Sequence, residues 1–262
     1  TRRKIPEGAI HLAADINDTE AVNRLLDNRN FDSVVNWIAY VPEEVGRDVR
    51  LFRDKTNQYI FISSASAYAK PPQLPLTESH PLGNPYWQYS RNKVICEQYL
   101  NEQAEKNGFP VTIVRPSHTY DETKIPLQGG YTALNRILSG KPVVVHGDGT
   151  SLWTLTHHRD FARGFMGLPG NSRAIGEAYH ITGDEVLTWD QIYNTMAEAA
   201  GREAKIIHVP SDIIHKYDTD WGEGLLGDKA YSLVFDNSKI KEFVPDLKTT
   251  IPFKKGAEEI IS

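Results

Sequence analysis

The sequence predicts an α/β fold in which a parallel sheet is covered by helices on both faces. Short, continuously apolar segments alternate with helical segments along the first half of the chain, as expected for strands that are buried on both faces. Several of these apolar segments also end in polar or small residues, namely Asp15, Ala39, Ser64 and Ser117. Ligands bind at the carboxyl ends of parallel strands, so this edge of the sheet is the predicted site.

The composition limits the classes of function. The 262 residues are 40% hydrophobic and 24% charged, which is ordinary for a globular protein of one large domain or two closely joined ones. The net charge of −5 argues against a general nucleic-acid or anionic-membrane surface. No apolar run approaches the roughly 20 residues of a membrane-spanning helix. The single cysteine, Cys96, cannot form an internal disulfide, which is compatible with a reducing compartment, and we expect the cytoplasm.

The first half of the chain holds most of the predicted sheet. The strands are expected at residues 9–12, 34–39, 59–62 and 111–114, and the helices at residues 20–26, 42–53 and 89–106. Asp18 or Thr19 is a candidate N-cap of the first helix, Pro42 begins the second, and Gly108 ends the third.

The second half is more irregular. Predicted helices begin near residues 132, 158 and 188, and predicted strands cover residues 141–146, 177–182 and 204–209. Thr188 is the predicted cap of the last of these helices. We expect residues 177–182 to return to the main sheet, residues 222–227 to form a flexible glycine-rich loop, and Lys229 to be solvated.

Ser64, Tyr89 and Lys93 form a candidate group for proton transfer. Tyr89 and Lys93 are four residues apart and therefore lie on one face of the predicted helix. The ammonium of Lys93 would favour ionisation of the Tyr89 phenol, whose ordinary pKa is about 10, and Ser64 would hydrogen-bond a substrate oxygen. The alternative is an ordinary surface pair on an amphipathic helix, but Ser64 and the α/β order favour catalysis.

With these residues in this order, the chain resembles the extended short-chain dehydrogenase/reductase family, the NAD-dependent epimerase/dehydratase group, over nearly its whole length. Residues 85–90, 118–120 and 147–158 further resemble an atypical subgroup, which includes putative bacterial UDP-glucose 4-epimerases and RNA-binding chloroplast stem-loop-binding proteins. The resemblance implies a Rossmann-type sheet with a small C-terminal α+β substrate domain. It assigns residues 1–118 and about 155–186 to an NAD(P)-binding domain, and about 119–154 and 187–262 to the substrate domain.

The resemblance also implies a role for each matching residue. Ser64, Tyr89 and Lys93 match the family's catalytic residues. NAD, with NADP as the alternative, would be bound by Asp15 and Ile16 at the adenine, by Ile38 and Ala39 beside the diphosphate and ribose, and by Tyr40, Ser63, Tyr89, Lys93, Pro116 and Ser117. Ser66, His118 and Trp153 would contact the substrate. No metal site is predicted, because the adjacent His157 and His158 point in different directions on a helix.

Three features depart from the family pattern. The glycine-rich phosphate loop would precede Thr1, so we expect the sequence to be part of a longer chain. Trp153 stands where nucleotide-sugar enzymes usually carry an arginine for the diphosphate. His118 stands where many relatives carry an asparagine that contacts the substrate. The last two replacements argue against a UDP-sugar as the substrate.

The leading hypothesis is an NAD(P)-dependent epimerase, dehydratase or reductase that acts on a hydroxyl of a sugar or nucleotide sugar. Tyr89 would remove the hydroxyl proton while hydride passes to the nicotinamide. The resemblance also implies a homodimer. An RNA-binding or regulatory protein on the same scaffold is the second hypothesis, which the net charge of −5 disfavours. A catalytically silent protein with the same fold is the third.

Overall fold

The computed structural model describes residues 5–262 and confirms the predicted α/β fold. Strands β1 (Val34–Asn36), β2 (Tyr59–Ile62), β3 (Val111–Pro116) and β8 (Ala178–Ile181) form a parallel sheet in the order β1-β2-β3-β8. Ile113 pairs with Ala178 in this sheet, so the predicted return of residues 177–182 to the main sheet is confirmed.

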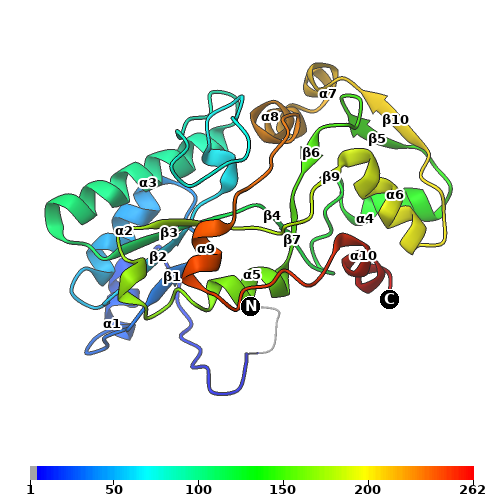
Figure 1. The fold of residues 1–262 in the computed structure, drawn as a ribbon. Coiled ribbons are helices and arrows are strands. Elements are labelled where there is room, and N and C mark those ends of the chain that lie inside the picture. Colours follow the sequence, from blue (N-terminus) through cyan, green and yellow to red (C-terminus); the bar gives the residue numbers. More distant parts are fainter. Residues whose placement is uncertain (1–4) are drawn as a thin grey trace.

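Alternation along β2 explains why helices cover both faces of the sheet. The covering helices are α1 (Thr19–Leu25), α2 (Pro42–Phe52), α3 (Gln88–Asn107), α5 (His158–Phe165) and α9 (Ser238–Phe243). Tyr59 and Phe61 pack in a core with side chains of α1, α2 and α3, whereas Ile60 and Ile62 pack with α5 and α9. Because successive strand side chains point to opposite faces, a continuously apolar strand needs an apolar layer on each side. Figure 1 shows the sheet between these two groups of helices.

The remaining elements, which come mostly from the second half of the chain, form a separate group beside the sheet (Figure 1). Its strands pair as β4 (His118–Tyr120) with β7 (Leu155–His157), β5 (Val143–His146) with β10 (Ile206–Val209), and β6 (Leu152–Trp153) with β9 (Leu187–Thr188). Its helices are α4 (Tyr131–Leu138), α6 (Trp189–Ala199), α7 (Ser211–Tyr217), α8 (Thr219–Gly224) and α10 (Phe253–Ile261). Short helical turns η1 (Ala65–Ala67), η2 (Ser172–Ala174) and the π-helical η3 (Leu225–Lys229) complete the chain.

Helix ends follow the signals in the sequence. The Asp18 side chain accepts a hydrogen bond from the backbone N–H of Ala21 (2.9 Å), so Asp18 rather than Thr19 caps α1. Gly108 ends α3 with a φ of 66°, a left-handed conformation that glycine adopts without strain. Thr188 and Gln191 form a reciprocal capping box at the start of α6.

Two of the predicted strands are wrong or too long. Residues 9–12 form no strand, and Ile10 is 76% exposed, because no other strand in residues 5–262 pairs with this segment. The strand expected at residues 34–39 ends at Asn36. The Asn36 side-chain oxygen accepts hydrogen bonds from the backbone N–H groups of Ile38 (2.8 Å) and Ala39 (2.7 Å), and this turn replaces strand pairing.

The flexible loop expected at residues 222–227 is also wrong, because this segment is helical within α8 and η3. The Asn84 amide donates a hydrogen bond to the carbonyl oxygen of Gly227 (2.6 Å), although the two residues are 143 positions apart. A Cβ atom on Gly227 would lie 2.6 Å from Cβ of Trp87, so the two backbones approach too closely for any other residue. The segment is therefore packed against the start of α3.

Candidate active site

The carboxyl ends of β2 and β3 open into a cavity of about 490 Å³, which we call the sheet-edge cavity. Its wall contains most of the residues that the sequence singled out: Tyr40, Ser63, Ser64, Ser66, Tyr89, Lys93, Pro116, Ser117, His118 and Trp153. Asp15, Ile16, Ile38 and Ala39 do not line it. The fold thus brings together the expected catalytic and substrate-binding residues, and part of the expected cofactor-binding set.

Tyr89 and Ser64 both line this cavity. Burial raises the pKa of Tyr89 above its ordinary value of 10.0, and the Ser64 hydroxyl opposes this rise only in part. The ring of Trp87 packs against Tyr89 with centroids 4.8 Å apart. Tyr89 is therefore protonated at neutral pH, and it shares the cavity wall with Ser64, the residue that would hold a substrate oxygen.

A chain of serine hydroxyls supports Ser64. The Ser64 and Ser66 hydroxyl oxygens are 2.9 Å apart, and Ser90 on α3 donates to Ser66 (2.7 Å). Ser66 is buried, and its carbonyl oxygen accepts a hydrogen bond from the Asn84 amide (2.9 Å). Ser66 lines the cavity, as expected for a substrate contact, but its hydroxyl is also occupied in orienting Ser64.

Lys93 differs from the prediction. Its ammonium donates to the carbonyl oxygens of Ala39 (2.7 Å) and Ile62 (2.8 Å), and burial lowers the pKa of Lys93 to about 8. It lies 5.8 Å from the centre of the Tyr89 ring. Besides burial, the groups that shift the pKa of Tyr89 are Ser64, Tyr40 and Asp228, so the expected lowering by Lys93 is not seen. Lys93 instead joins the ends of two strands beneath the tyrosine.

The other expected cofactor contacts, Asp15, Ile16, Ile38 and Ala39, lie outside the cavity. The exposed Asp15 carboxylate accepts a hydrogen bond from the N–H of Asn17 (2.9 Å), which is the plain turn role that a short acidic residue often takes. Ile38 is 54% exposed beside the free edge of β1. Ala39 is buried and contributes its carbonyl oxygen to Lys93.

Ser63 is tied to a buried ion pair. Its hydroxyl donates to the Glu97 carboxylate (2.5 Å), and Arg115 donates to the same carboxylate through Nη2 (2.7 Å) and Nε. Glu97 and Arg115 are almost completely buried. Because the Ser63 proton points at Glu97, the Ser63 oxygen offers the cavity only acceptor lone pairs.

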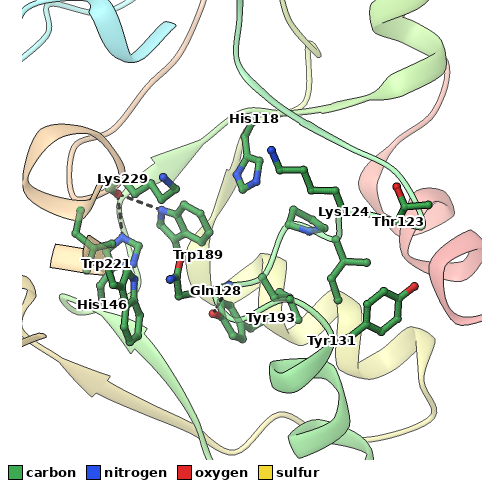
Figure 2. A pocket seen from close by; sticks show the side chains of 15 residues that line it. His118, Thr123, Lys124, Gln128, Tyr131, His146, Trp189, Tyr193, Trp221 and Lys229 are labelled. Carbon is green, nitrogen blue, oxygen red and sulfur yellow. Dashed lines mark hydrogen bonds between the residues drawn. The ribbon is translucent and has the colours of Figure 1, made fainter. Parts of the chain in front are cut away.

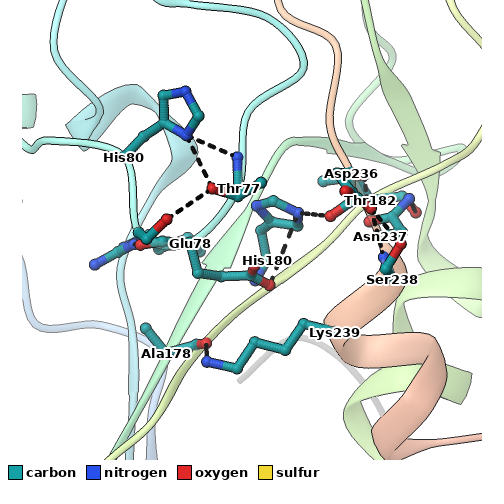
Figure 3. Close-up of polar contacts among 12 residues, drawn as sticks. Thr77, Glu78, His80, Ala178, His180, Thr182, Asp236, Asn237, Ser238 and Lys239 are labelled. Carbon is teal, nitrogen blue, oxygen red and sulfur yellow. Dashed lines mark hydrogen bonds and ion pairs between the residues drawn. The ribbon is translucent and has the colours of Figure 1, made fainter.

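Further polar contacts anchor the layers around the site (Figure 3). Arg115 donates to the Tyr68 hydroxyl (3.2 Å), which lies 3.3 Å from Nδ1 of His180. Nε2 of His180 contacts the carbonyl oxygen of Asp236 (2.5 Å), so that oxygen accepts the imidazole proton. Lys239 donates to the carbonyl oxygen of Ala178 (2.8 Å), which attaches α9 to β8. The segment 236–239 therefore supports the sheet and does not line the cavity.

Three charged residues of this wall were not assigned to the site from the sequence. Lys124, Asp228 and Lys229 line the sheet-edge cavity, and Lys229, which was expected to be solvated, is half-buried. Asp228 is buried and pairs with Lys70 (3.2 Å). No local pattern marks these residues, because only the packing of η3 against the start of α3 brings Asp228 and Lys229 to the site.

A second cavity of about 400 Å³, which we call the outer cavity, adjoins the first and shares His118, Lys124 and Lys229 with it (Figure 2). Trp153 donates its Nε1–H to Nδ1 of His118 (3.2 Å), so the proton of the neutral imidazole resides on Nε2. Burial, together with Lys229 and Lys124, lowers the pKa of His118 to about 3. His118 is thus a neutral hydrogen-bond donor and not a titrating group at neutral pH.

A parallel sheet with a serine, a tyrosine and a lysine beside its carboxyl edge defines a protein of the extended short-chain dehydrogenase/reductase class. The chain belongs to the NAD dependent epimerase/dehydratase family, whose sequence model matches residues 49–181.

Individual relatives share the fold at low identity. The chloroplast stem-loop binding protein of 41 kDa b from Arabidopsis thaliana is 29% identical over 201 residues, which are 76% of this chain and 51% of that protein. The 2'-dehydrokanamycin reductase of Streptomyces kanamyceticus is 22% identical over 246 residues, 92% of this chain and 68% of that protein. The solved structure of UDP-glucuronic acid 4-epimerase from Bacillus cereus, in complex with UDP-glucuronic acid and NAD, matches with a TM-score of 0.77 and 19% identity, over 95% of this chain and 79% of that one. This chain spans about half the length of the chloroplast relative.

Residues 5–262 contain neither a candidate membrane-spanning helix nor a candidate metal site. None of the helices in this range combines the length and apolarity that crossing a membrane requires. Within the same range, no group of three His, Cys, Asp or Glu side chains is placed to hold a metal ion. His157 instead contacts Glu259 (3.2 Å), and Asp160 accepts hydrogen bonds from the backbone of Thr250 (3.1 Å) and Ile251 (3.0 Å).

Proposed function

We propose that the protein is an NAD(P)-dependent oxidoreductase or isomerase that acts on a hydroxyl of a sugar or nucleotide sugar. The observation that carries this proposal is the placement of Ser64, Tyr89 and Lys93 in one cavity wall at the carboxyl edge of the sheet. The family membership and the NAD in the complex of the Bacillus cereus epimerase support it. In the same proposal, residues 1–118 and about 155–186 form the cofactor domain, the rest forms the substrate domain, and the protein is a homodimer.

The residues of the sheet-edge cavity fit the nicotinamide end of NAD(P). Tyr40 follows β1, Pro116 and Ser117 lie at the end of β3, and the acceptor lone pairs of Ser63 at the end of β2 suit a donor such as the carboxamide N–H. Asp15 and Ile16, expected at the adenine, lie outside this cavity, so the described residues fit the nicotinamide half better than the adenine half. When bound, the nicotinamide would supply the hydride acceptor.

The chain's own residues would handle the proton. With the pKa of Tyr89 above 10.0, the phenol begins as an acid, so it is suited to protonate an alkoxide during reduction of a carbonyl. In the reverse direction the phenolate must form before it accepts the hydroxyl proton. Ser64 would hold the reacting oxygen throughout, since the serine chain behind it fixes its orientation.

The acid–base groups of the cavity favour reduction or epimerisation over elimination of water. Dehydration requires an additional acid to protonate the leaving hydroxyl. Among the described residues, Asp228 is the only carboxylic acid in the cavity wall, and it is paired with Lys70. Tyr89 and Ser64 are sufficient for oxidation and reduction at one carbon. We therefore propose reductase or epimerase activity in preference to dehydratase activity.

The RNA-binding alternative has support from the name of the chloroplast relative, a stem-loop binding protein. The net charge of −5 opposes it, since binding to the phosphate backbone depends on an excess of basic groups. We do not propose it as the function.

Replacement of Tyr89 by phenylalanine tests the proposal. We expect Tyr89→Phe to lose at least about a hundredfold in turnover with NAD(P) and a panel of sugars and nucleotide sugars, while cofactor binding changes little. Tyr217→Phe is the matched control, because Tyr217 is 90% exposed and does not line the cavity. Full activity of Tyr89→Phe would contradict the mechanism, and absence of NAD(P) binding by the wild type would contradict the whole proposal.

A further inference from the structure

Two acceptor side chains hold four consecutive backbone N–H groups in the loop between β1 and α2. Oδ1 of Asn36 accepts hydrogen bonds from two of these groups (2.8 and 2.7 Å), and Oε2 of Glu44 accepts from the other two (2.5 and 3.1 Å). The four N–H groups belong, in chain order, to Ile38, Ala39, Tyr40 and Val41. The loop has no strand pairing, so its conformation depends on these two side chains.

Asp48 of α2 sets the direction of the Asn36 amide. The amide N–H of Asn36 donates to the Asp48 carboxylate, so the amide oxygen faces the loop. The same carboxylate oxygen accepts a hydrogen bond from the Tyr59 hydroxyl (2.7 Å), and the other oxygen lies 3.4 Å from Nε of Arg47. Asn36 and Asp48 are both buried, so water does not compete for these bonds.

The loop presents the carbonyl oxygen of Ala39 to Lys93. The ammonium of Lys93 donates to this oxygen (2.7 Å) and to the carbonyl oxygen of Ile62 (2.8 Å). It also lies 4.9 Å from the ring centre of Tyr40 and 4.8 Å from that of Phe61. An ammonium has three N–H donors, and Lys93 lines the sheet-edge cavity, so one donor is left for a ligand. The positions of the two carbonyl oxygens therefore determine where this third donor points.

We propose that Asn36, oriented by Asp48, is a positioning residue for the reaction. It fixes the carbonyl oxygen of Ala39 and thereby directs the third N–H of Lys93 at the ligand in the sheet-edge cavity. Neither Asn36 nor Asp48 lines this cavity, so any effect on the ligand must pass through other residues. The inference rests on the proposed function, because it takes the ligand to be NAD(P). Small displacements of a group that orients a reactant have large effects on its contribution.

The remaining contacts of the loop determine what Asn36→Ala should change. Glu44 still holds the second half of the loop, and Lys93 still donates to Ile62. We therefore expect the fold to persist while Lys93 loses its direction. The affinity for NAD(P) should fall by about tenfold or more, as when a hydrogen bond to a charged group is lost.

A double-mutant cycle in NAD(P) affinity distinguishes positioning from general damage to the fold. Calorimetric titration of the full chain with NAD and with NADP compares the wild type, Asn36→Ala, Lys93→Met and the double variant. Asn36→Ala should lose about tenfold in affinity when Lys93 is present and less than about twofold in the Lys93→Met background, because its effect acts through Lys93. Asn135→Ala, at an exposed residue of α4, is the matched control and should bind as the wild type does.

Exchanging the two polar residues provides a rescue. In Asn36→Asp/Asp48→Asn the amide at position 48 can donate to the carboxylate at position 36, which still accepts the two loop N–H groups, and Tyr59 can donate to the amide oxygen. This double variant should bind NAD(P) within about twofold of the wild type. Urea unfolding checks that each variant is folded.

Three results would overturn the inference while the wild type binds NAD(P). They are wild-type affinity in Asn36→Ala, an equal loss of affinity with and without Lys93, and an exchanged pair that is folded but binds as weakly as Asn36→Ala. Each of these would leave the proposed function intact. Absence of NAD(P) binding by the wild type would contradict the proposed function and this inference together.

Discussion

The ammonium of Lys93 donates a hydrogen bond to the carbonyl oxygen of Ala39, 2.7 Å away, across 54 positions of the chain. A second bond to Ile62 (2.8 Å) makes this lysine a link between the ends of β1 and β2. Lys93 is only 2% exposed, so the link places a desolvated charge beneath the Tyr89 ring.

Replacement of Lys93 by methionine should change how stability depends on pH. The pKa of Lys93 is about 8 in the folded protein, against an ordinary 10.5, so the unfolded chain binds more protons between these values. The part of the free energy of unfolding that depends on Lys93 therefore rises from pH 8 to pH 10.5. Relative to Lys93→Met, the wild type should gain on the order of 3 kcal/mol over this window.

Urea unfolding of both proteins at pH 7.5 and pH 9.5 measures the difference. Other groups titrate alike in the two proteins, so their contributions largely cancel. Lys141→Met serves as the reference for a lysine that is exposed. A constant difference between wild type and Lys93→Met at the two pH values would show that the Lys93 pKa is not lowered.

Replacement of Ser64 by alanine should impair turnover and shift its pH profile. The Ser64 hydroxyl lowers the pKa of Tyr89 against the effect of burial, so its loss raises that pKa further. We expect kcat to fall by about a hundredfold, as when one positioned donor is removed from a reacting oxygen. In the oxidation direction, kcat/KM should rise with pH as Tyr89 loses its proton, and this rise should move to higher pH in Ser64→Ala.

The exposed Ser139→Ala is the control for this variant. Ser64→Thr keeps the hydroxyl. It should recover part of the activity, and its kcat/KM should rise over the same pH range as in the wild type. A Ser64→Ala enzyme with wild-type kcat and an unshifted profile would rule out the role given to Ser64.

Gly227 and Gly224 offer a matched pair of substitutions in the same segment. A Cβ atom on Gly227 would lie 2.6 Å from Cβ of Trp87 and 3.0 Å from the Asn84 side-chain oxygen. Gly227→Ala should therefore lower the free energy of unfolding by about 1–3 kcal/mol and reduce activity, since Trp87 supports Tyr89. A Cβ atom on Gly224 meets nothing closer than 3.8 Å, so Gly224→Ala should be neutral or slightly stabilising. Thermal unfolding compares the stability of Gly227→Ala and Gly224→Ala. Equal destabilisation of the two variants would contradict the prediction.

The Glu97 carboxylate should be essential for stability. Glu97→Gln leaves the buried Arg115 guanidinium without a counter-charge, which should lower the free energy of unfolding by about 3–5 kcal/mol. Glu102→Gln breaks a pair with Lys106 that is exposed to solvent, and it should leave stability almost unchanged. Denaturant titration at neutral pH compares the two. Similar effects of both changes would show that burial does not control the energy of the Glu97–Arg115 pair.

Much of the fold was predictable because its signals are local. The apolar segment 59–62, the cap at Asp18 and the glycine at position 108 each act within a few residues, and the structure confirms all three. The two failures at the start of the chain have a common physical cause. A strand needs a partner and a free backbone, whereas residues 9–12 have no paired strand in the described chain, and the Asn36 side chain takes the N–H groups that would have extended β1.

The sequence by itself determined which residues could meet at the site. A serine at the end of β2 and a tyrosine and lysine one helical turn apart on α3 come together whenever the parallel sheet forms. The pKa values of the site residues and the remaining residues of the sheet-edge cavity depend on the tertiary structure. Burial raises the pKa of Tyr89, the carbonyl oxygens of two strand ends capture Lys93, and η3 carries Lys229 into a place that its local sequence does not suggest. Desolvation and long-range packing depend on what surrounds a group in space, and that information is distributed over the whole chain.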